Sequence, residues 1–283
     1  MDPITLDPIP PEFAVSLSDS SLAGARAWDA RGLVRMLRAG NTKHPLTRRE
    51  LTAEEKRNVR AVAGRWTPMH LAASRGDVET MARHLGMRDA VAEEGETPLT
   101  LAMDAGKWEA ARWLLEEAGA RPDPPGADAN QVMTPLCVAC GRRRVDLTEA
   151  LLRAGARVTS LSLAFLMHAS PSPSVGTSIR LLLDHVADES EKARLASRCA
   201  RMAVRARNHP AIRFFLDDPP DPNFAAETVF VAIGADDVLL LRDVADAGYD
   251  MDSRDPDGRS VLWFARRVDP DSLVVRCLSA SAY

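Results

Sequence analysis

Apolar residues in this chain recur at helical spacing in short runs that come in pairs. Within residues 94–120, Thr97 followed by Pro98 predicts the start of one helix, and Gly106 and Gly119 predict the ends of that helix and a second one. The apolar positions on one face of each helix are Leu99, Ala102 and Met103, then Ala111, Leu114 and Leu115. Helices this short cannot bury their apolar faces as an isolated pair, so the pair needs neighbours.

The same phrases recur along the chain. A Thr-Pro pair followed by apolar residues begins at Thr67, Thr97 and Thr134, at steps of 30 and 37 residues, and a weaker copy lies at residues 257–262. The apolar pairs that close a second helix are Leu114–Leu115, Leu151–Leu152, Leu182–Leu183 and Phe215–Leu216, at steps of 37, 31 and 33 residues. Periods of this length predict a solenoid, in which each unit packs on its neighbours.

These phrases resemble the ankyrin repeat family, whose unit is a β-turn followed by two antiparallel helices. The resemblance rests on the TP-apolar phrases and on closing phrases such as RAGA at residues 153–156 and DAGYD at 246–250. It covers roughly residue 22 to the C-terminus and is weakest between 159 and 223, where the repeats are degenerate. It implies an all-α ankyrin-repeat solenoid of helix-turn-helix units with β-turn loops. It also implies a structural role for His70, which would hydrogen-bond between turns.

The sequence predicts a disordered, proline-rich tail over residues 1–17, because four of the first eleven residues are proline. Residues 18–283 are predicted to form a single ankyrin-repeat domain of about 7–8 repeats. The repeats are expected to be atypical at 18–65 and 159–223.

Three stretches depart from the repeat. Residues 18–40 are interpreted as an atypical first repeat, with Trp28 in its first helix. Residues 41–65 are too long for an ankyrin loop, and the capping-box phrase at 52–55 predicts a helix there. That helix is either a solvated surface element or a docking element that caps the groove. The proline-rich residues 121–132 predict an irregular finger.

Composition favours a cytoplasmic protein. The N-terminus has no apolar signal region, and no run approaches the ~18 apolar residues of a membrane span. The four cysteines are irregularly spaced, so no disulfide framework is predicted. Abundant Ala and Arg suggest a GC-rich genome, most simply a bacterial one. An exported protein would instead act in a host cell.

Motifs for catalysis and metal binding are weak. Cys137 and Cys140 form a lone C-x-x-C, whereas a zinc site needs a second pair and a thioredoxin-like site follows a strand. We therefore interpret both as small core residues, and we predict no catalytic residue, metal or cofactor. An enzyme hidden in the degenerate stretch stays an alternative. Its candidate residues are Ser162, His168, Ser170 and Asp184.

Basic side chains gather on one predicted helix. Arg194, Arg198, Arg201 and Arg205 step by 4, 3 and 4 residues, which places them within about 60° of arc on a helix. In the family's register, the ends of first helices line a groove, and the residues assigned to similar places there are Arg75, Arg142, Arg205 and Arg267, with Asp104 interrupting the row. This pattern is either a solvated helix face or a basic groove that attracts an acidic partner.

The opposite charge dominates residues 217–257. This segment has twelve acidic residues against two arginines, a net charge of −10. It would suit a basic patch on a partner. Nucleic acid is disfavoured as a partner, because this segment repels phosphate and the interleaved aromatic residues of strand-binding proteins are missing. No membrane contact is predicted.

The resemblance implies a non-enzymatic protein–protein interaction module that uses turn tips and first-helix surfaces. The most concrete role is a bacterial immunity or inhibitor protein that binds and neutralises a cognate toxin; the alternative is a secreted effector that binds a host protein. We expect a monomer. Trp66 is either the anchor of the interface or a residue packed on the helix near 52–62. The predicted partner-binding residues are Trp66, Arg75, Glu96, Asp104, Met133, Arg142, Arg194, Arg198, Arg201, Arg205 and Arg259.

Overall fold

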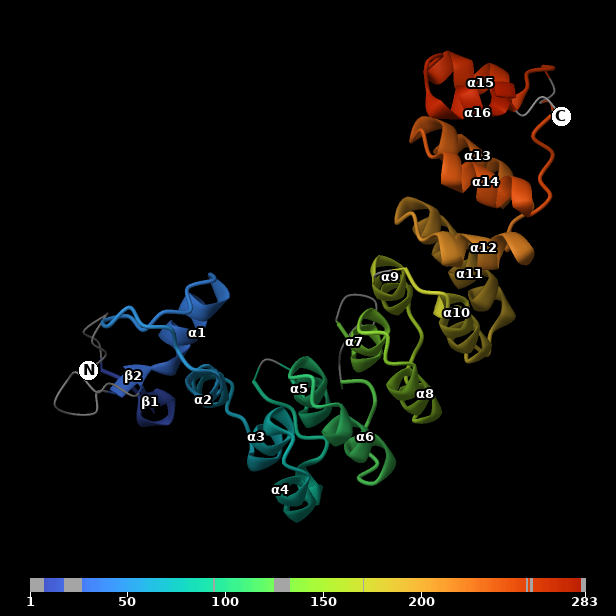
Figure 1. Ribbon diagram of the computed structural model, residues 1–283. Coiled ribbons are helices and arrows are strands. Elements are labelled where there is room, and N and C mark those ends of the chain that lie inside the picture. The colour runs from blue at the N-terminus through green and yellow to red at the C-terminus, as the bar shows by residue number, and fades with distance from the viewer. Residues whose placement is uncertain are drawn as a thin grey trace. The chain divides into compact units, whose positions relative to one another are not determined.

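A computed structural model of the chain describes residues 8–17, 27–93, 95–124, 133–169, 171–252, 254 and 257–280 (Figure 1). The described residues form sixteen α-helices, which confirms the predicted all-α ankyrin-type fold. The chain divides into two compact units, residues 1–126 and residues 127–283. That residues 18–283 fold as one domain stays a prediction.

Unit 1 begins with a small hairpin. The 3₁₀-helix η1 (Pro11–Phe13) leads into β1 (Ala14–Ser16), which pairs antiparallel with β2 (Ala27–Asp29). Phe13, Val15 and Leu17 are buried. The prediction of a disordered tail is therefore wrong for residues 11–17, because alternate apolar residues give the strand one face that packs into the core. Residues 1–7 of the predicted tail lie outside the described residues.

Trp28 was predicted to lie in a helix, but it lies in strand β2. Its side chain is 2% exposed, and its ring lies edge-on to the ring of His44 at 5.3 Å between centroids. Pairing with β1 holds residues 27–29 extended, which is why the predicted helix does not include them. The rest of that predicted helix, in residues 18–26, lies outside the described residues.

The hairpin packs on two helices, α1 (Ala30–Arg38) and α2 (Ala53–Ala63). The predicted capping box of α2 is confirmed: Thr52 Oγ1 accepts from the Glu55 N–H at 3.1 Å, and the Glu55 carboxylate accepts from the Thr52 N–H at 2.9 Å. The Glu55 side chain is only 8% exposed and also pairs with Arg49 at 2.5 Å. Val59 is fully buried. The predicted helix in the long 41–65 segment is thus a fixed part of unit 1.

Two helix pairs of the repeat follow in unit 1. They are α3 (Pro68–Arg75) with α4 (Val78–Arg83), and α5 (Pro98–Asp104) with α6 (Trp108–Glu116), with a 3₁₀-helix η2 (Leu85–Met87) after α4. Thr67 and Thr97 cap α3 and α5, as predicted. Gly76 and Gly106 have φ of +82° and +68° at the turn inside each pair, where a residue without a Cβ avoids strain.

His70 links the two pairs. Its ring is fully buried, Nδ1 accepts from the Thr67 backbone N–H at 3.1 Å, and Nε2 lies 3.1 Å from the Glu96 carbonyl oxygen. Because Nδ1 accepts, Nε2 carries the proton and donates to that carbonyl. The structural role implied for His70 is confirmed. Burial lowers the pKa of this imidazole.

This burial makes the stability of unit 1 depend on pH. The pKa of His70 is lowered in the folded state, so its contribution is complete above the unfolded value of about 6.5 and is lost as the pH falls below it. We expect the stability difference between the wild type and His70→Gln to shrink by up to about 1.4 kcal/mol per pH unit as the pH falls from 6.5. Urea unfolding at pH 5.0 to 7.5 measures it. A difference that stays constant over this range would contradict the assignment.

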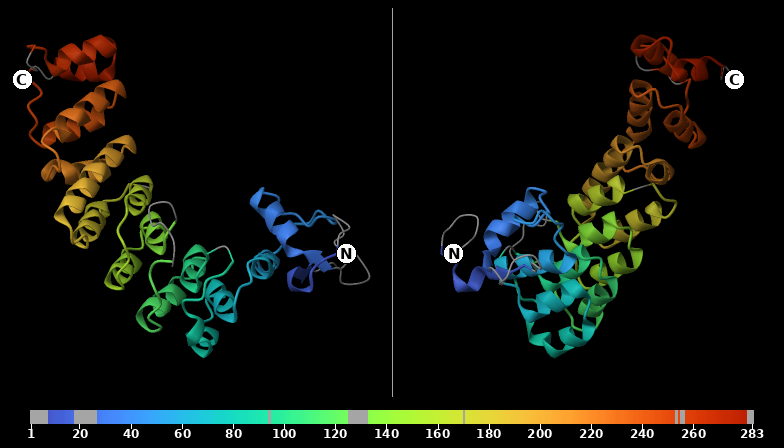
Figure 2. Two further views of the ribbon diagram at one scale, coloured as in Figure 1. Left: turned by 180° about the vertical axis from the view of Figure 1, so that it is seen from behind. Right: turned by 60° about the vertical axis from the view of Figure 1, so that its left-hand side comes forward.

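Unit 2 continues the same architecture with five described helix pairs (Figure 2). Odd-numbered helices contact odd-numbered neighbours and even-numbered helices contact even-numbered ones, so each pair stacks on the next. The degenerate stretch 159–223 therefore keeps the helix-pair arrangement. The helices are α7 (Pro135–Gly141), α8 (Val145–Arg153), α9 (Ser160–His168), α10 (Val175–Asp184), α11 (Glu189–Arg205), α12 (His209–Asp217), α13 (Phe224–Gly234), α14 (Val238–Asp246), α15 (Val261–Val268) and α16 (Leu273–Ala280).

Candidate protein-binding surfaces

Helix α11 presents a row of basic side chains in unit 2. Arg194, Arg198, Arg201 and Arg205 are all exposed and line one shallow groove, of about 790 Å³, together with Ser190, Ala193, Ser197 and Met202. The opposite face of the helix is buried through Leu195, Cys199 and Ala203. The predicted common face of the four arginines is thus present. We call it the arginine face.

Most of this charge has no partner in the described residues. Arg201 lies 4.0 Å from Asp221 and 3.9 Å from Glu227, which are long ion-pair distances. Arg194, Arg198 and Arg205 make no ion pair with any residue that the structure describes. Exposed, unpaired guanidinium groups are available to carboxylates of another molecule.

The prediction that charged residues at the ends of first helices occupy equivalent places in successive repeats is wrong. In five of the helix pairs, the turn between the two helices has one described residue with positive φ, which gives a structural register: Gly76, Gly106, Arg143, Arg207 and Asp236. Arg75 and Arg142 directly precede that residue, whereas Asp104 and Arg205 stand two positions before it. One residue is 100° of helix rotation, so these side chains are not equivalent. Repeats of unequal length hide this shift in the sequence.

An aromatic cluster extends the surface beyond α11, and sequence reasoning missed it. Phe230 on α13 is 53% exposed and Trp263 on α15 is 42% exposed. Their rings are connected through Phe264, with centroid distances of 5.2 Å and 5.0 Å. The available signal was the register, because Trp263 follows the N-cap Ser260 by three residues, as His70 follows Thr67. An indole at that position departs from the repeat.

Two arginines flank this aromatic cluster, which we define as Phe230, Trp263 and Phe264. Arg259 lies 5.4 Å from the Trp263 ring centroid and Arg267 lies 5.7 Å from it. Arg259, predicted as a turn-tip contact, also pairs with Asp257. Exposed aromatic side chains beside arginines are typical of the residues that dominate protein–protein interfaces.

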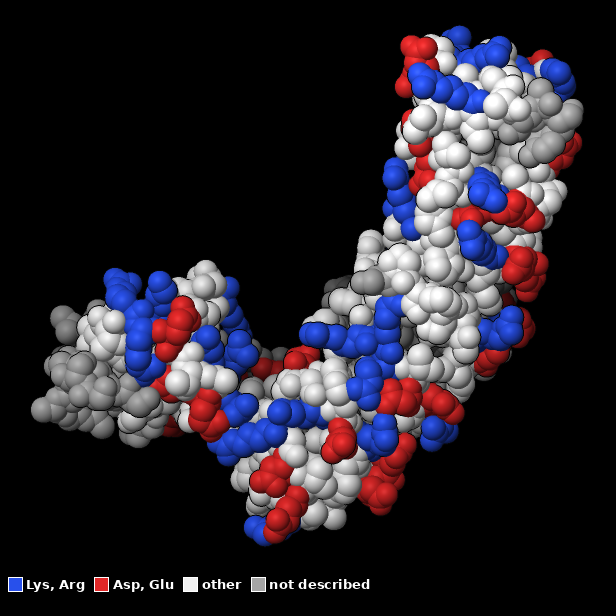
Figure 3. Space-filling model, viewed as in Figure 1, with Lys and Arg blue, Asp and Glu red and all other residues white. Residues whose placement is uncertain are grey.

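The acidic segment 217–257 uses much of its charge internally. Asp236 caps α16 by accepting from the Leu273 and Val274 N–H groups at 3.2 and 2.9 Å. Asp237 caps α14, and Asp243 is buried. Accordingly, Figure 3 shows acidic and basic side chains interspersed over the visible face of this part of the chain. The formal charge of a segment overstates the charge that its surface offers.

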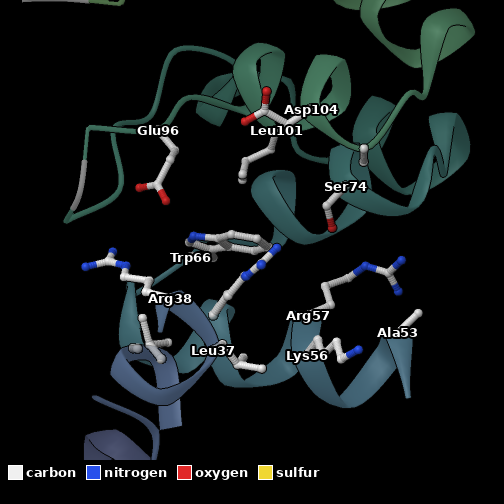
Figure 4. Close-up of a pocket in the computed structure, with 14 residues that line it drawn as sticks. Leu37, Arg38, Ala53, Lys56, Arg57, Trp66, Ser74, Glu96, Leu101 and Asp104 are labelled. Carbon is white, nitrogen blue, oxygen red and sulfur yellow. The ribbon is translucent and has the colours of Figure 1, made fainter. Parts of the chain in front are cut away.

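Unit 1 contains a separate groove of about 470 Å³ (Figure 4). Three predicted residues line it: Trp66, Glu96 and Asp104. Trp66 is half-buried between α2 and α5, as the packing interpretation expects, and it lines the open groove; that it anchors an interface stays a prediction. Arg75 does not line it; its guanidinium pairs with Glu54 on α2.

The remaining predicted contacts stand apart from these surfaces. Met133 is 49% exposed just before α7, and Arg142 is exposed at the end of that helix. Nothing in the described residues brings either one to the arginine face or to the aromatic cluster. The predicted finger lies mostly in residues 125–132, outside the described residues.

The geometry gives little support to an enzyme site or a metal site. Cys137 and Cys140 are buried free thiols, as predicted for core residues, and burial raises the pKa of Cys140 to about 12. The Ser162 hydroxyl donates to the Thr159 carbonyl at 2.8 Å in the cap of α9. Asp184 pairs with Lys192 at 3.5 Å on another helix, and Ser170 lies outside the described residues. In the described part of the chain, no group of three or more potential ligands is arranged to hold a metal.

Comparison with known proteins agrees with the repeat geometry. Residues 34–126 match the model for ankyrin repeats, with three copies. This part of the chain consists of ankyrin repeats. No curated protein matches it in sequence. Ankyrin repeats indicate a protein–protein interaction module, in a family whose members generally act as non-enzymatic scaffolds.

Solved structures are similar to this ankyrin repeat protein in fold. The ankyrin repeat domain of Bcl-3, described as a unique member of the IkappaB protein family, has a TM-score of 0.52 at 21% identity and covers 71% of this chain and 96% of its own. The human ASB11 ankyrin repeat domain has a TM-score of 0.49 at 20% identity and covers 76% and 97%. Within the described residues, no helix combines the length and the apolar composition that crossing a membrane requires.

Proposed function

We propose that this ankyrin repeat protein binds a protein partner through the face of unit 2 that is made by α11, α13 and α15. The observation that carries the proposal is the arginine face, where three exposed guanidinium groups have no ion-pair partner among the described residues. Such a surface attracts carboxylates and raises the rate of encounter with an acidic partner.

The aromatic cluster supplies the apolar part of the same interface. A small groove lined by Arg201, Arg205, Phe224 and Val231 lies between α11 and α13, and α13 contacts α15. The arginine face and the aromatic cluster therefore lie on three helices that contact one another in series. The partner is a protein that presents carboxylates next to an apolar side chain.

The most concrete role is that of an immunity or inhibitor protein in a bacterial cytoplasm, where the chain acts as a monomer and neutralises a cognate toxin. Tight inhibition needs a surface that combines charge steering with aromatic anchors, and unit 2 has both. A secreted effector that binds a host protein is the alternative. A toxin gene beside this gene would favour the immunity role, and a gene for a secretion chaperone would favour the effector role.

Reversing charge on the arginine face should abolish binding. We expect Arg201→Glu/Arg205→Glu to lose at least 100-fold in affinity for the partner, because two attractive contacts become repulsive, at roughly 1.4 kcal/mol for each factor of ten. The partner is first captured with the wild-type chain from lysate of the source organism or of a host. Its affinity for both chains is then measured by calorimetry.

A matched control is Arg153→Glu/Arg242→Glu. It makes the same change in net charge on α8 and α14, where both side chains are more than half exposed. We expect this variant to bind like the wild type. A partner that binds the Arg201/Arg205 variant as tightly as the wild type would move the interface away from the arginine face.

A further inference from the structure

The groove of unit 1 has the features of a second binding site. Its volume of about 470 Å³ lies within the roughly 300–1,000 Å³ of ligand pockets. One wall is α2, and the other is α5 with the turn before it (Figure 4). The groove lies wholly within unit 1.

The walls of the groove are formed before any ligand arrives. The start of α2 is fixed by the capping box of Thr52 and Glu55 and by the buried pair of Glu55 with Arg49. Val59 anchors the middle of the helix in the core of unit 1. A preformed groove avoids the entropy cost of ordering a loop on binding.

The floor of the groove is apolar and comes from several elements. Leu37 of α1, Leu101 of α5 and the indole of Trp66 line it. In Figure 4 the indole lies in the middle, between Leu37 on one side and Leu101 on the other. An aromatic face between two leucines is suited to an apolar side chain.

Charges are divided between the two sides. The basic residues of the lining are Lys56, Arg57 and Arg60 on α2 and Arg38 on α1, and the acidic ones are Glu96 and Asp104 on the other side. Arg57 is already paired with Glu54, and the Lys56 ammonium is 3.9 Å from the Glu50 carboxylate.

Arg60 differs from its neighbours on α2. Its exposed guanidinium has no ion pair within the described residues. The α2 side therefore offers unmet positive charge at Arg60 and weakly paired charge at Lys56.

We propose that this groove binds an extended acidic peptide. A carboxylate side chain of the peptide contacts Arg60 and Lys56, and an apolar side chain next to it lies on Trp66. Backbone N–H groups of the peptide donate to the carboxylates of Glu96 and Asp104. In an extended strand, neighbouring side chains point to opposite sides, so alternating acidic and apolar residues match the groove.

The probe is a fluorescein-labelled octapeptide of alternating Glu and Leu, followed by anisotropy with the full chain. We expect binding that falls at least tenfold in Lys56→Glu/Arg60→Glu and at least threefold in Trp66→Ala. Arg35→Glu/Arg83→Glu changes the same charge outside the groove and should leave the affinity unchanged. Circular dichroism of each variant confirms that it is folded.

Other outcomes overturn the proposal. Binding that survives Lys56→Glu/Arg60→Glu but is lost in Arg201→Glu/Arg205→Glu places the peptide on the arginine face of unit 2. Tighter binding of a Lys–Leu octapeptide or of oligo-dT would assign the groove to another class of ligand. If the Glu–Leu probe does not bind at all, the proposal is rejected. Since the arginine face is tested by its own variant, failure of the groove leaves the proposed function of unit 2 untouched.

Discussion

Asp243→Ala should lower the free energy of unfolding of unit 2 by about 2–3 kcal/mol, because hydrogen bonds to a buried charged group are worth more than neutral ones. The Asp243 side chain on α14 is 2% exposed. One carboxylate oxygen accepts from His209 Nδ1 at 2.6 Å, and the other accepts from Arg213 Nε at 2.7 Å. Both donors lie on α12, so this carboxylate joins two neighbouring repeats. Removing it leaves the His209 donor without its acceptor.

The effect is separated from a general loss of charge by a matched variant. Asp246→Ala removes a carboxylate from the same helix, but that side chain is 67% exposed and lies 3.7 Å from Arg242. Exposed pairs of this kind contribute about 0–1 kcal/mol. Urea unfolding of both variants gives the two free energies. If Asp243→Ala costs no more than Asp246→Ala, the buried cluster does not hold the repeats together.

The repeat architecture was predictable because helix caps and repeated apolar pairs can be recognised in the sequence. Thr67, Thr97 and Thr134 cap their helices where the sequence placed them, and the period of the paired leucines sets the stacking. The capping box at Thr52 was found for the same reason, since an N-cap needs only three or four neighbouring residues. Each of these caps lies within one helical turn, so no tertiary information is needed to recognise it.

The surfaces were harder to predict because they depend on register and on distant partners. The four arginines on α11 share a face because they belong to one helix, whereas the row across repeats failed when turn lengths changed. Asp243 looked like surface charge until His209 and Arg213, 34 and 30 residues away, were placed beside it. Likewise, the place of Trp263 after the Ser260 cap does not reveal that its side chain is 42% exposed. Burial is a property of the neighbours, which the local pattern does not specify.

Removing residues 1–17 should destabilise the start of unit 1 by about 4 kcal/mol. The deletion takes away Phe13, Val15 and Leu17, which are at most 8% exposed, and burying each large apolar side chain contributes about 1.5–3 kcal/mol before allowance for residual burial in the unfolded chain. It also removes β1, so β2 loses its hydrogen-bonding partner and Trp28 becomes exposed to water.

The loss should be local, because a solenoid repeat contacts only its neighbours. Hydrogen exchange measured by mass spectrometry should show faster exchange in α1 and α2, with α11 to α16 unchanged. The matched control is a deletion of residues 1–7, which keeps η1 and β1 and should leave exchange in α1 and α2 as in the wild type. Protection of α1 that persists without residues 1–17 would mean that the hairpin rests on the helices without supporting them. Loss of protection would instead make the hairpin the cap that shields the first apolar helix face, the part that a terminal repeat plays in other solenoids.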